Sequence, residues 1–391
     1  MYGETWLVDR DHAISLDRLG KREQSPPHLN PSSVVTGGAP SACEVTFPLP
    51  GRRAEAALQE SLREAPMTHR SLSYLVTLVA SLSVLPLLVA SARAVTLEAG
   101  DILVACHGAG IAEFDWAVVR VHPDSGTQAI VSSDQYLDGL GGVAILSDNQ
   151  VFITTQRTNG GDGSVLSVDP ATGVQTILAT GDYLVSPTGL EAAGGQLIVA
   201  DIGDHTGSGF VVRVDPSSGD QTLLASGGGL RQPVATATAS NGDIYVLDAG
   251  FGSDLGGIFR ISGATGDVVE LAERSGLRAI TIDSDGAVYV ATSLGEVAVV
   301  DTSSGDLTTI SQGGLIQDPW GIAVDADGFV LITNAFVVSE TNVVRIDPGD
   351  GSQEVVSSEG LLTVPLSLAV WTDGSIQSKT TTWGRVKGSY R

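Results

Sequence analysis

Six copies of one sequence unit occupy most of this chain and constrain its fold more than any other feature. In each copy an apolar segment ends in a turn: VVRVHPDSG begins at Val118, FVVRVDPSSG at Phe210 and NVVRIDPGDG at Asn342. The unit recurs every 46 or 47 residues, apart from one copy of 39. Pro fixes its own φ in these turns, and the later Gly takes a positive φ. The segment therefore predicts a strand joined by a tight turn to a second strand.

A second hairpin in each unit has its own turn signal. The segments ATATASNGDIYVLD, AITIDSDGAVYVAT and GIAVDADGFVLITN turn at Asn-Gly or Asp-Gly pairs. Such pairs favour the primed turns that match the twist of the flanking strands. Four short strands per unit, which we label A to D, with a period in the forties, are typical of propeller blades. We therefore predict an all-β, six-bladed β-propeller over residues 95–374.

The two ends of the repeat region predict how the ring closes. PLSLAVWTDG, near residues 365–374, supplies a strand A with no B, C or D after it. The three missing strands are expected at the start of the region: GDILVAC from Gly100, then residues 117–122 and 127–132. A blade built from both ends closes the ring and removes a free sheet edge. The remaining tail, residues 375–391, shows no usable pattern.

The units resemble NHL-type repeats and the wider group that includes the senescence marker protein/gluconolactonase family and the streptogramin lyases. The resemblance covers about residues 97–374. It implies the propeller fold and leaves the chemistry open, because the same ring carries hydrolases, lyases and pure binding proteins.

The resemblance also implies where an enzyme of this group would place its metal. In the gluconolactonase-like proteins, acidic or amide side chains at the starts of the inner strands hold a divalent ion. The matching positions here contain no Asp, Asn or Glu: Leu140-Gly141, Thr188-Gly189, Val234-Ala235, Leu277-Arg278, Trp320-Gly321 and Leu366-Ser367. Streptogramin lyases need a His base near metal-bound acids, and here only His205 lies beside acids. We assign no catalytic residue.

Charge and cysteine content exclude several functions. The formal net charge is −24, and residues 1–94 contribute none of it, because their nine Lys and Arg match nine Asp and Glu. Between Val95 and Ser378 there are eight Arg and no Lys. We therefore expect no nucleic acid partner, since phosphate contacts need clustered basic residues. Cys106 would be alone in the mature chain, so no disulfide framework is expected.

An export signal begins inside the chain. After Met67 come a short polar start with Arg70, an apolar run over residues 72–90, and Ala92-Arg93-Ala94. This order predicts a signal peptide over residues 67–94 and a mature start at Val95. Residues 1–66 are then a misassigned start or a disordered leader. In the alternative the apolar run stays as a membrane anchor. Both interpretations place the propeller outside the cytoplasm, in the periplasm or the extracellular space.

Strand order separates the connections into two faces of the ring. The A–B and C–D turns share one face and are short, whereas the B–C loops and D–A connections share the other. The B–C loops vary from Ser293-Leu294-Gly295 to the eleven residues CHGAGIAEFDW. Insertions gathered on one face of a repeat protein usually mark its binding face. We therefore expect a ligand on the B–C loop face.

Five residues of that face are candidates for ligand binding. Arg278 and Trp320 lie near the starts of their strands A, at the channel mouth, where a cation and a flat ring suit a small anionic or carbohydrate ligand. The alternative is that Trp320 fills the ring and Arg278 pairs with a carboxylate. Asp201, Asp248 and Asn334 begin three of the B–C loops.

Two further carboxylates, Asp204 and Asp254, lie in Gly-rich loops that resemble each other. Calcium takes carboxylates and carbonyls from flexible loops. The spacing fits no known calcium loop, and Asp and Gly are ordinary loop residues, so a plain surface loop explains both positions as well. Calcium is the one cofactor for which the sequence offers ligands.

The sequence thus predicts an exported, monomeric binding module that recognises a protein, a glycan or a small ligand. The alternative is a metal-dependent lactonase, esterase or lyase of the group that the repeats resemble. A third interpretation is a structural module of the cell surface.

Overall fold

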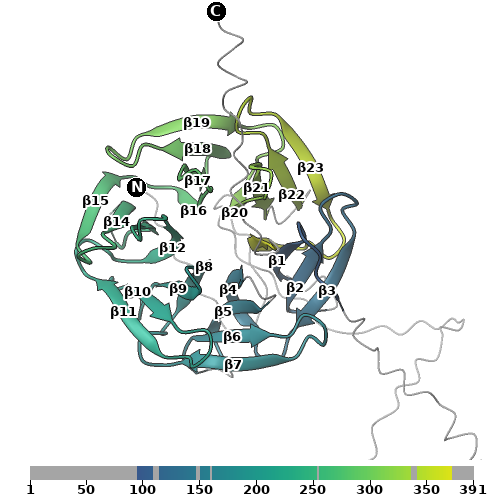
Figure 1. Cartoon of the computed structure of the whole chain (residues 1–391), viewed down its shortest axis with the longest axis horizontal. Coiled ribbons are helices and arrows are strands. Elements are labelled where there is room, and N and C mark those ends of the chain that lie inside the picture. The colour runs from purple at the N-terminus through teal and green to yellow at the C-terminus, as the bar shows by residue number, and fades with distance from the viewer. Residues whose placement is uncertain are drawn as a thin grey trace, which may run out of the picture. The chain divides into compact units, whose positions relative to one another are not determined.

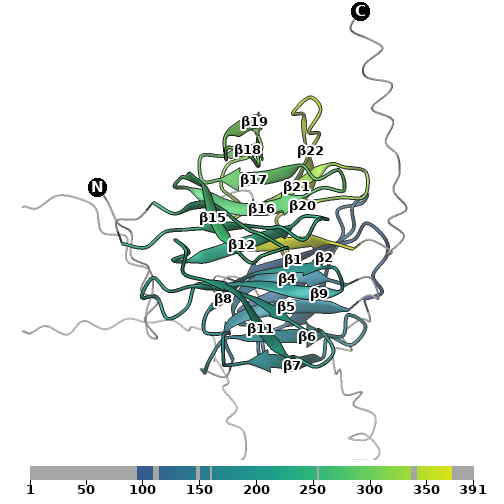
Figure 2. The ribbon, with the colours of Figure 1, turned by 60° about the vertical axis from the view of Figure 1, so that its left-hand side comes forward.

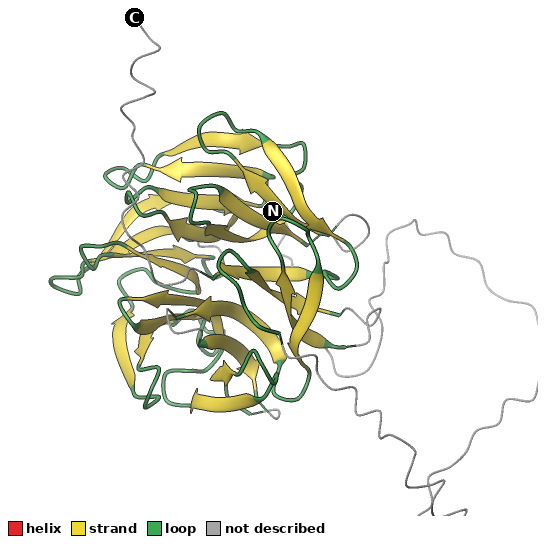
Figure 3. Cartoon of the chain, turned by 45° about the vertical axis from the view of Figure 1, so that its right-hand side comes forward, coloured by secondary structure: helices red, strands yellow, loops and turns green. Residues whose placement is uncertain are grey.

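The computed structural model describes residues 95–108, 114–146, 150–158, 161–252, 255–335 and 341–371. All of them belong to one compact unit, residues 90–391. The predicted leader, signal peptide and tail, together with Asp254, lie outside the described residues. The described residues contain strands and no α-helix (Figure 3). Accordingly, none of them forms a helix able to cross a bilayer.

The described strands form six antiparallel sheets of four, arranged in a ring (Figure 1). One sheet joins the two ends of the unit: β24 (Pro365–Val370), β1 (Ile102–His107), β2 (Trp116–Val121) and β3 (Gln128–Ser133). This confirms the predicted six-bladed propeller.

The other five blades follow in chain order, and strands A to D run from the centre of the ring outward. Their strands are β4 (Asp138–Ile145), β5 (Val151–Arg157), β6 (Ser164–Val168) and β7 (Gln175–Thr180); β8 (Pro187–Ala193), β9 (Gln196–Asp201), β10 (Phe210–Val214) and β11 (Gln221–Ser226); β12 (Pro233–Thr238), β13 (Ile244–Asp248), β14 (Gly257–Ile261) and β15 (Val268–Glu273); β16 (Leu277–Ile282), β17 (Val288–Thr292), β18 (Glu296–Val300) and β19 (Leu307–Gln312); β20 (Pro319–Val324), β21 (Val330–Asn334), β22 (Asn342–Ile346) and β23 (Gln353–Ser358).

The closing blade pairs the last described strand with the first. Strand β24 runs antiparallel to β1, from Ile102 opposite Val370 to Cys106 opposite Pro365. The yellow β24 lies beside the blue β1 in both views of the ribbon (Figures 1 and 2). The predicted closure by both ends is therefore present in the described residues.

Burial along each strand follows its place in the blade. Every residue of β17, a strand B, is buried, because both of its faces are covered by the sheets on either side. Strand β23, a strand D, is half exposed at the rim. The apolar clusters accordingly combine residues of neighbouring blades, such as Leu247 of β13 with Val290 of β17. Stacking of blades therefore supplies the core, as expected for repeats that cannot bury both faces alone.

Small residues allow the inner strands to approach one another. A Cβ on Gly189 of β8 would lie 2.7 Å from the carbonyl oxygen of Val234 in β12. A Cβ on Gly141 would lie 2.3 Å from the carbonyl oxygen of Thr188. The repeated Gly near the start of strand A is thus explained by close backbone contact between blades.

Glutamines at the start of strand D link adjacent blades. Gln175 donates from Nε2 to Ser132 Oγ at 2.9 Å and to the Asp134 carbonyl at 3.1 Å, and its Oε1 accepts from the Tyr136 amide at 2.9 Å. Gln128, Gln221 and Gln353 make matching bonds to the blade before theirs. These bonds tie the end of one strand D to the next blade.

Candidate functional site

The strand directions place the two sets of connections as the sequence predicts. We call the face with the B–C loops and D–A connections the loop face, and the face with the A–B and C–D turns the turn face. Strand A therefore begins at the loop face and ends at the turn face, and residues near its two ends border opposite ends of the central channel.

Arg278 and Trp320 meet at the loop-face end of the channel. They occupy the second positions of β16 and β20, which belong to adjacent blades. The Arg278 Cζ atom lies 4.3 Å from the centroid of the Trp320 ring, a cation–π contact. Both side chains stay about one third exposed. The structure brings these two predicted residues together.

Asp318, which sequence reasoning missed, holds this pair in place. Its Oδ2 accepts a hydrogen bond from Trp320 Nε1 at 2.9 Å, and its Oδ1 lies 3.9 Å from a guanidinium nitrogen of Arg278. The sequence signal was an Asp two residues before the Trp. Arg278 thus both stacks on Trp320 and lies near the Asp318 carboxylate, and the Arg278 and Trp320 side chains remain partly open to solvent.

Asn334 fixes the backbone segment that carries Asp318. Its Oδ1 accepts from the backbone amides of Gln317 and Asp318 at 3.1 and 3.2 Å, and its Nδ2 donates to the Leu315 carbonyl at 2.7 Å. The side chain is buried, so it fixes the D–A connection that carries Asp318. In this structure Asn334 positions the candidate site and does not face solvent.

Asp201 and Asp248 occupy the matching position in two other blades. The Asp201 carboxylate accepts from the amides of Val185, Ser186 and Gly203 at 2.7–3.1 Å. Asp248 accepts from the amides of residues 231, 232 and 250 at 2.7–2.9 Å. Burial raises the pKa of both carboxyls, against the opposite pull of these donors. The expected ligand contacts of Asp201, Asp248 and Asn334 stay predictions. In the structure, the side chains of all three accept hydrogen bonds from backbone amides of D–A connections.

The calcium hypothesis stays a prediction, because only one of its two predicted ligands lies in the described residues. Asp204 is exposed, and Thr206 donates to its Oδ1 from the backbone amide at 3.1 Å and the hydroxyl at 2.5 Å, which lowers the Asp204 pKa. Asp254 lies outside the described part of the chain. Within that part, no three His, Cys, Asp or Glu side chains gather as a metal site requires.

Cys106 and His107, at the end of β1, are covered. Burial raises the pKa of the Cys106 thiol, which keeps the sulfur in its unreactive protonated form. The His107 ring stacks on Trp116 with 4.3 Å between centroids, and burial lowers its pKa. Both side chains serve packing in this structure.

More than half of the exposed large apolar side chains in the described chain lie on the loop face, spread over several blades. Five of the nine exposed large apolar residues in the described chain belong to its loops or to the strand ends beside them: Tyr183, Phe251, Leu255, Leu294 and Trp320. Leu294 is the most open, at 77% exposure. The Phe251 ring also packs on Gly207 of the neighbouring blade, where a Cβ would lie 2.9 Å from it. We call these five residues the apolar patch.

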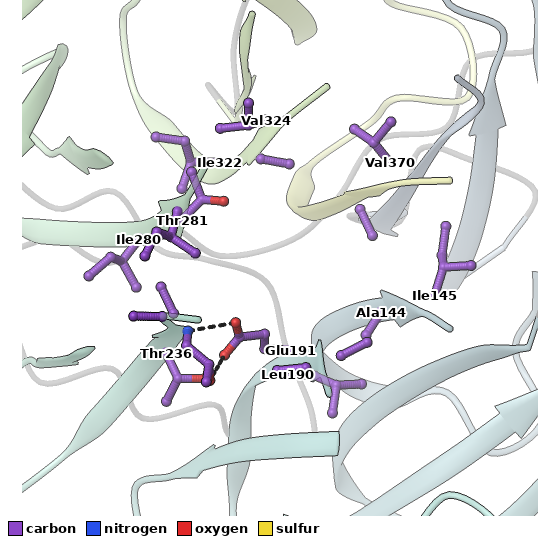
Figure 4. A pocket seen from close by; sticks show the side chains of 18 of the residues that line it. Ala144, Ile145, Leu190, Glu191, Thr236, Ile280, Thr281, Ile322, Val324 and Val370 are labelled. Atoms are coloured by element: carbon purple, nitrogen blue, oxygen red, sulfur yellow. Dashed lines mark hydrogen bonds between the residues drawn. The ribbon is translucent and has the colours of Figure 1, made fainter. Parts of the chain in front are cut away.

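The turn-face end of the channel contains a cavity of about 570 Å³. The inner strands of all six blades line it, and most of the lining residues are of aliphatic type (Figure 4). Glu191 of β8 is the one ionisable residue in the described lining. Its Oε1 accepts from the Thr238 amide at 2.7 Å and its Oε2 from the Thr238 hydroxyl at 2.8 Å. Sequence reasoning missed Glu191, although an acid in the second half of a strand A was a readable signal.

Glu191 predicts a pH dependence of stability. Burial raises its pKa, so the folded state holds the proton more tightly than the unfolded state does. Stability from this group is full below the unfolded pKa of about 4.3 and is lost as pH rises through the folded pKa. We expect the Tm of Glu191→Gln relative to wild type to increase between pH 4 and pH 8. Thermal melts followed by circular dichroism measure this, and a constant or falling difference would contradict it.

Comparison with known proteins supports the fold and no finer statement about family or function. No known protein family and no curated protein matches the chain by sequence. A chain in the crystal structure of a nidogen/laminin complex is similar in structure, with a TM-score of 0.56 and 14% sequence identity. The match covers 70% of this chain and 98% of that chain. At this identity the similarity shows the fold alone, and the relationship to NHL repeats or to gluconolactonases stays a prediction.

Proposed function

We propose that this chain is an exported propeller that binds another protein through its loop face. The observation that carries the proposal is the Arg278–Trp320 stack at the channel mouth, on the same face as the apolar patch. Trp, Tyr and Arg are the residue types that dominate binding energy at protein interfaces. The similar chain noted above also comes from a complex between two proteins.

The chemistry of the channel mouth suggests what the partner presents there. Arg278 Nε is buried and makes no hydrogen bond in the structure, and the ion pair with Asp318 is long at 3.9 Å. A carboxylate or carbonyl of the partner would accept from this guanidinium, while an apolar side chain packs beside Trp320. The apolar patch then forms the surrounding contact area. No contact in the described residues favours the hydrolase or lyase alternative, which stays an expectation from the resemblance.

A photo-crosslinking residue placed on each face tests the proposal. Leu294 on the loop face and Val174 on the turn face are both exposed, at 77% and 58%. We expect p-benzoylphenylalanine at position 294 to form a protein adduct with the extracytoplasmic proteins of the source organism, and the same residue at position 174 to form none. Trp320→Ala should weaken adduct formation about tenfold, because truncating a central interface aromatic costs more than 1 kcal/mol.

Other outcomes would overturn the proposal. The same adduct from both positions would mean that capture is unspecific. An adduct at position 294 that contains glycan and no polypeptide would replace the protein partner by a carbohydrate.

Export is part of the proposal and rests on the sequence pattern of residues 67–94. Val95, the predicted first residue after cleavage, is buried in a core cluster together with Leu97. Sequencing the N-terminus of the exported protein tests this: a start at Val95 supports cleavage, and a start at Met1 contradicts it.

A further inference from the structure

The cavity at the turn-face end of the channel is separate from the loop-face site. It involves the last residues of the inner strands, such as Ile282 and Val324, whereas Arg278 and Trp320 lie near the other ends of β16 and β20. Its volume of about 570 Å³ is in the range of pockets that hold small organic molecules. Ile145, Leu190, Ile322 and Val370 provide aliphatic surface around it (Figure 4).

Glu191 gives this cavity of mainly aliphatic residues one charged group with spare acceptor capacity. An ionised carboxylate has about four lone-pair sites, and only two of them are used by Thr238. No described lining residue is basic, so no cation of the lining compensates the charge. A lone charge at such a place is costly unless it is paired, and a cationic ligand would pair it.

The Thr236 hydroxyl, which lies beside Glu191, also lacks a hydrogen-bond partner of ordinary geometry. Thr236 is only 7% exposed and lines the cavity, and its hydroxyl lies beside the Glu191 carboxyl. The hydroxyl nevertheless makes no hydrogen bond of ordinary geometry. Buried polar groups are normally satisfied, so a partner arriving in the cavity would complete this pair of side chains.

The rim of the cavity is negatively charged, as Glu191 is when ionised. The A–B turns that border it carry Asp243, Asp283, Asp285 and Asp325. Arg260 and Arg345 pair with two of these, Asp243 at 4.0 Å and Asp325 at 2.9 Å. Carboxylates remain in excess around the entrance, and such a field attracts cations and repels anions.

We propose that this cavity is a second binding site, for a small organic amine whose ammonium group pairs with Glu191 and whose apolar body fills the aliphatic channel. The ammonium donates to the free lone pairs of the carboxylate and, where it reaches, to the Thr236 hydroxyl. The aliphatic and threonine lining supplies no cation to bind a carboxylate ligand.

Three probes of one shape test the site by isothermal titration calorimetry at pH 8: 3-phenylpropan-1-amine, 3-phenylpropan-1-ol and 3-phenylpropanoate. We expect wild type to bind the amine most tightly and the carboxylate least. Glu191→Gln should weaken the amine about tenfold and leave the alcohol unchanged, because it replaces a charge-assisted bond by a neutral one. Thr281→Phe, which fills the cavity, should abolish binding of both.

Control variants separate this site from general charge and from the loop face. Asp220→Asn removes one charge from an outer turn of the same face and should leave amine binding unchanged. Trp320→Ala should also leave it unchanged, so failure here and failure of the protein-binding proposal are distinguishable. The proposal is wrong if wild type does not bind the amine at millimolar concentration, if amine and carboxylate bind equally, or if Glu191→Gln and Asp220→Asn weaken the amine alike. A melt confirms that each variant is folded.

Discussion

Removing residues 365–391 is expected to abolish the cooperative unfolding of this protein, because β24 holds the ring closed. The deletion takes away the strand that pairs with β1 from Ile102 to Cys106. It exposes Ile102 and Val104, which are fully buried, and leaves an open edge on β1. It also leaves β4 and β20 without the inner strand that lies between them. A ring whose core lies between blades then loses two interfaces at once.

A shorter deletion is the matched control. Removing residues 372–391 keeps every strand of the closing blade. We expect this variant to melt cooperatively with a Tm close to that of wild type, and the longer deletion to show a broad transition and aggregation in size-exclusion chromatography. Equal Tm values for the two deletions would contradict the ring-closure argument.

The ring itself was predictable because its signals are local and repeated. Turn pairs such as Asn241-Gly242 fix each hairpin, and their recurrence fixes the number of blades. The closure followed from counting, since a strand A near residue 365 has no successors and the strands near Gly100 have no predecessor. Each of these inferences needs only short-range patterns and the rule that sheet edges are protected.

The roles of the polar residues were less predictable, because burial is set by contacts between distant segments. Asp201 and Asp248 read as loop carboxylates, yet the D–A connection folds over each and directs its backbone amides at them. Only the structure shows that Asn334 does the same work in a third blade. Glu191 was missed for a related reason: the acid in strand A can be read from the sequence, but its burial at a cavity lined by all six strands A depends on contacts between distant segments.

The comparison of these three blades leads to a prediction for Asp201. Asp201→Ala leaves the amides of Val185, Ser186 and Gly203 without their acceptor in a buried site. We expect it to lower the free energy of unfolding by about 3–5 kcal/mol, since each buried unsatisfied donor costs about 1–3 kcal/mol. Asp201→Asn keeps one oxygen that can serve Ser186 and Gly203 and should cost about 1–2 kcal/mol. Urea unfolding at pH 7 measures both losses, and equal losses would show that the carboxylate charge itself is needed.

The pH dependence of the stability difference between wild type and Asp201→Asn shows which effect on the Asp201 pKa is larger, burial or hydrogen bonding. Because burial raises the Asp201 pKa, wild type loses stability from this group as pH rises through the folded pKa, whereas Asp201→Asn has no such group to titrate. The deficit of Asp201→Asn relative to wild type should therefore be largest near pH 4 and shrink towards pH 8. If the deficit grows with pH, the three amide donors outweigh burial, and the carboxylate is held as an anion in the folded state. In both cases Asp201 acts on the position of the D–A connection, and through such connections the blades place the loop-face site.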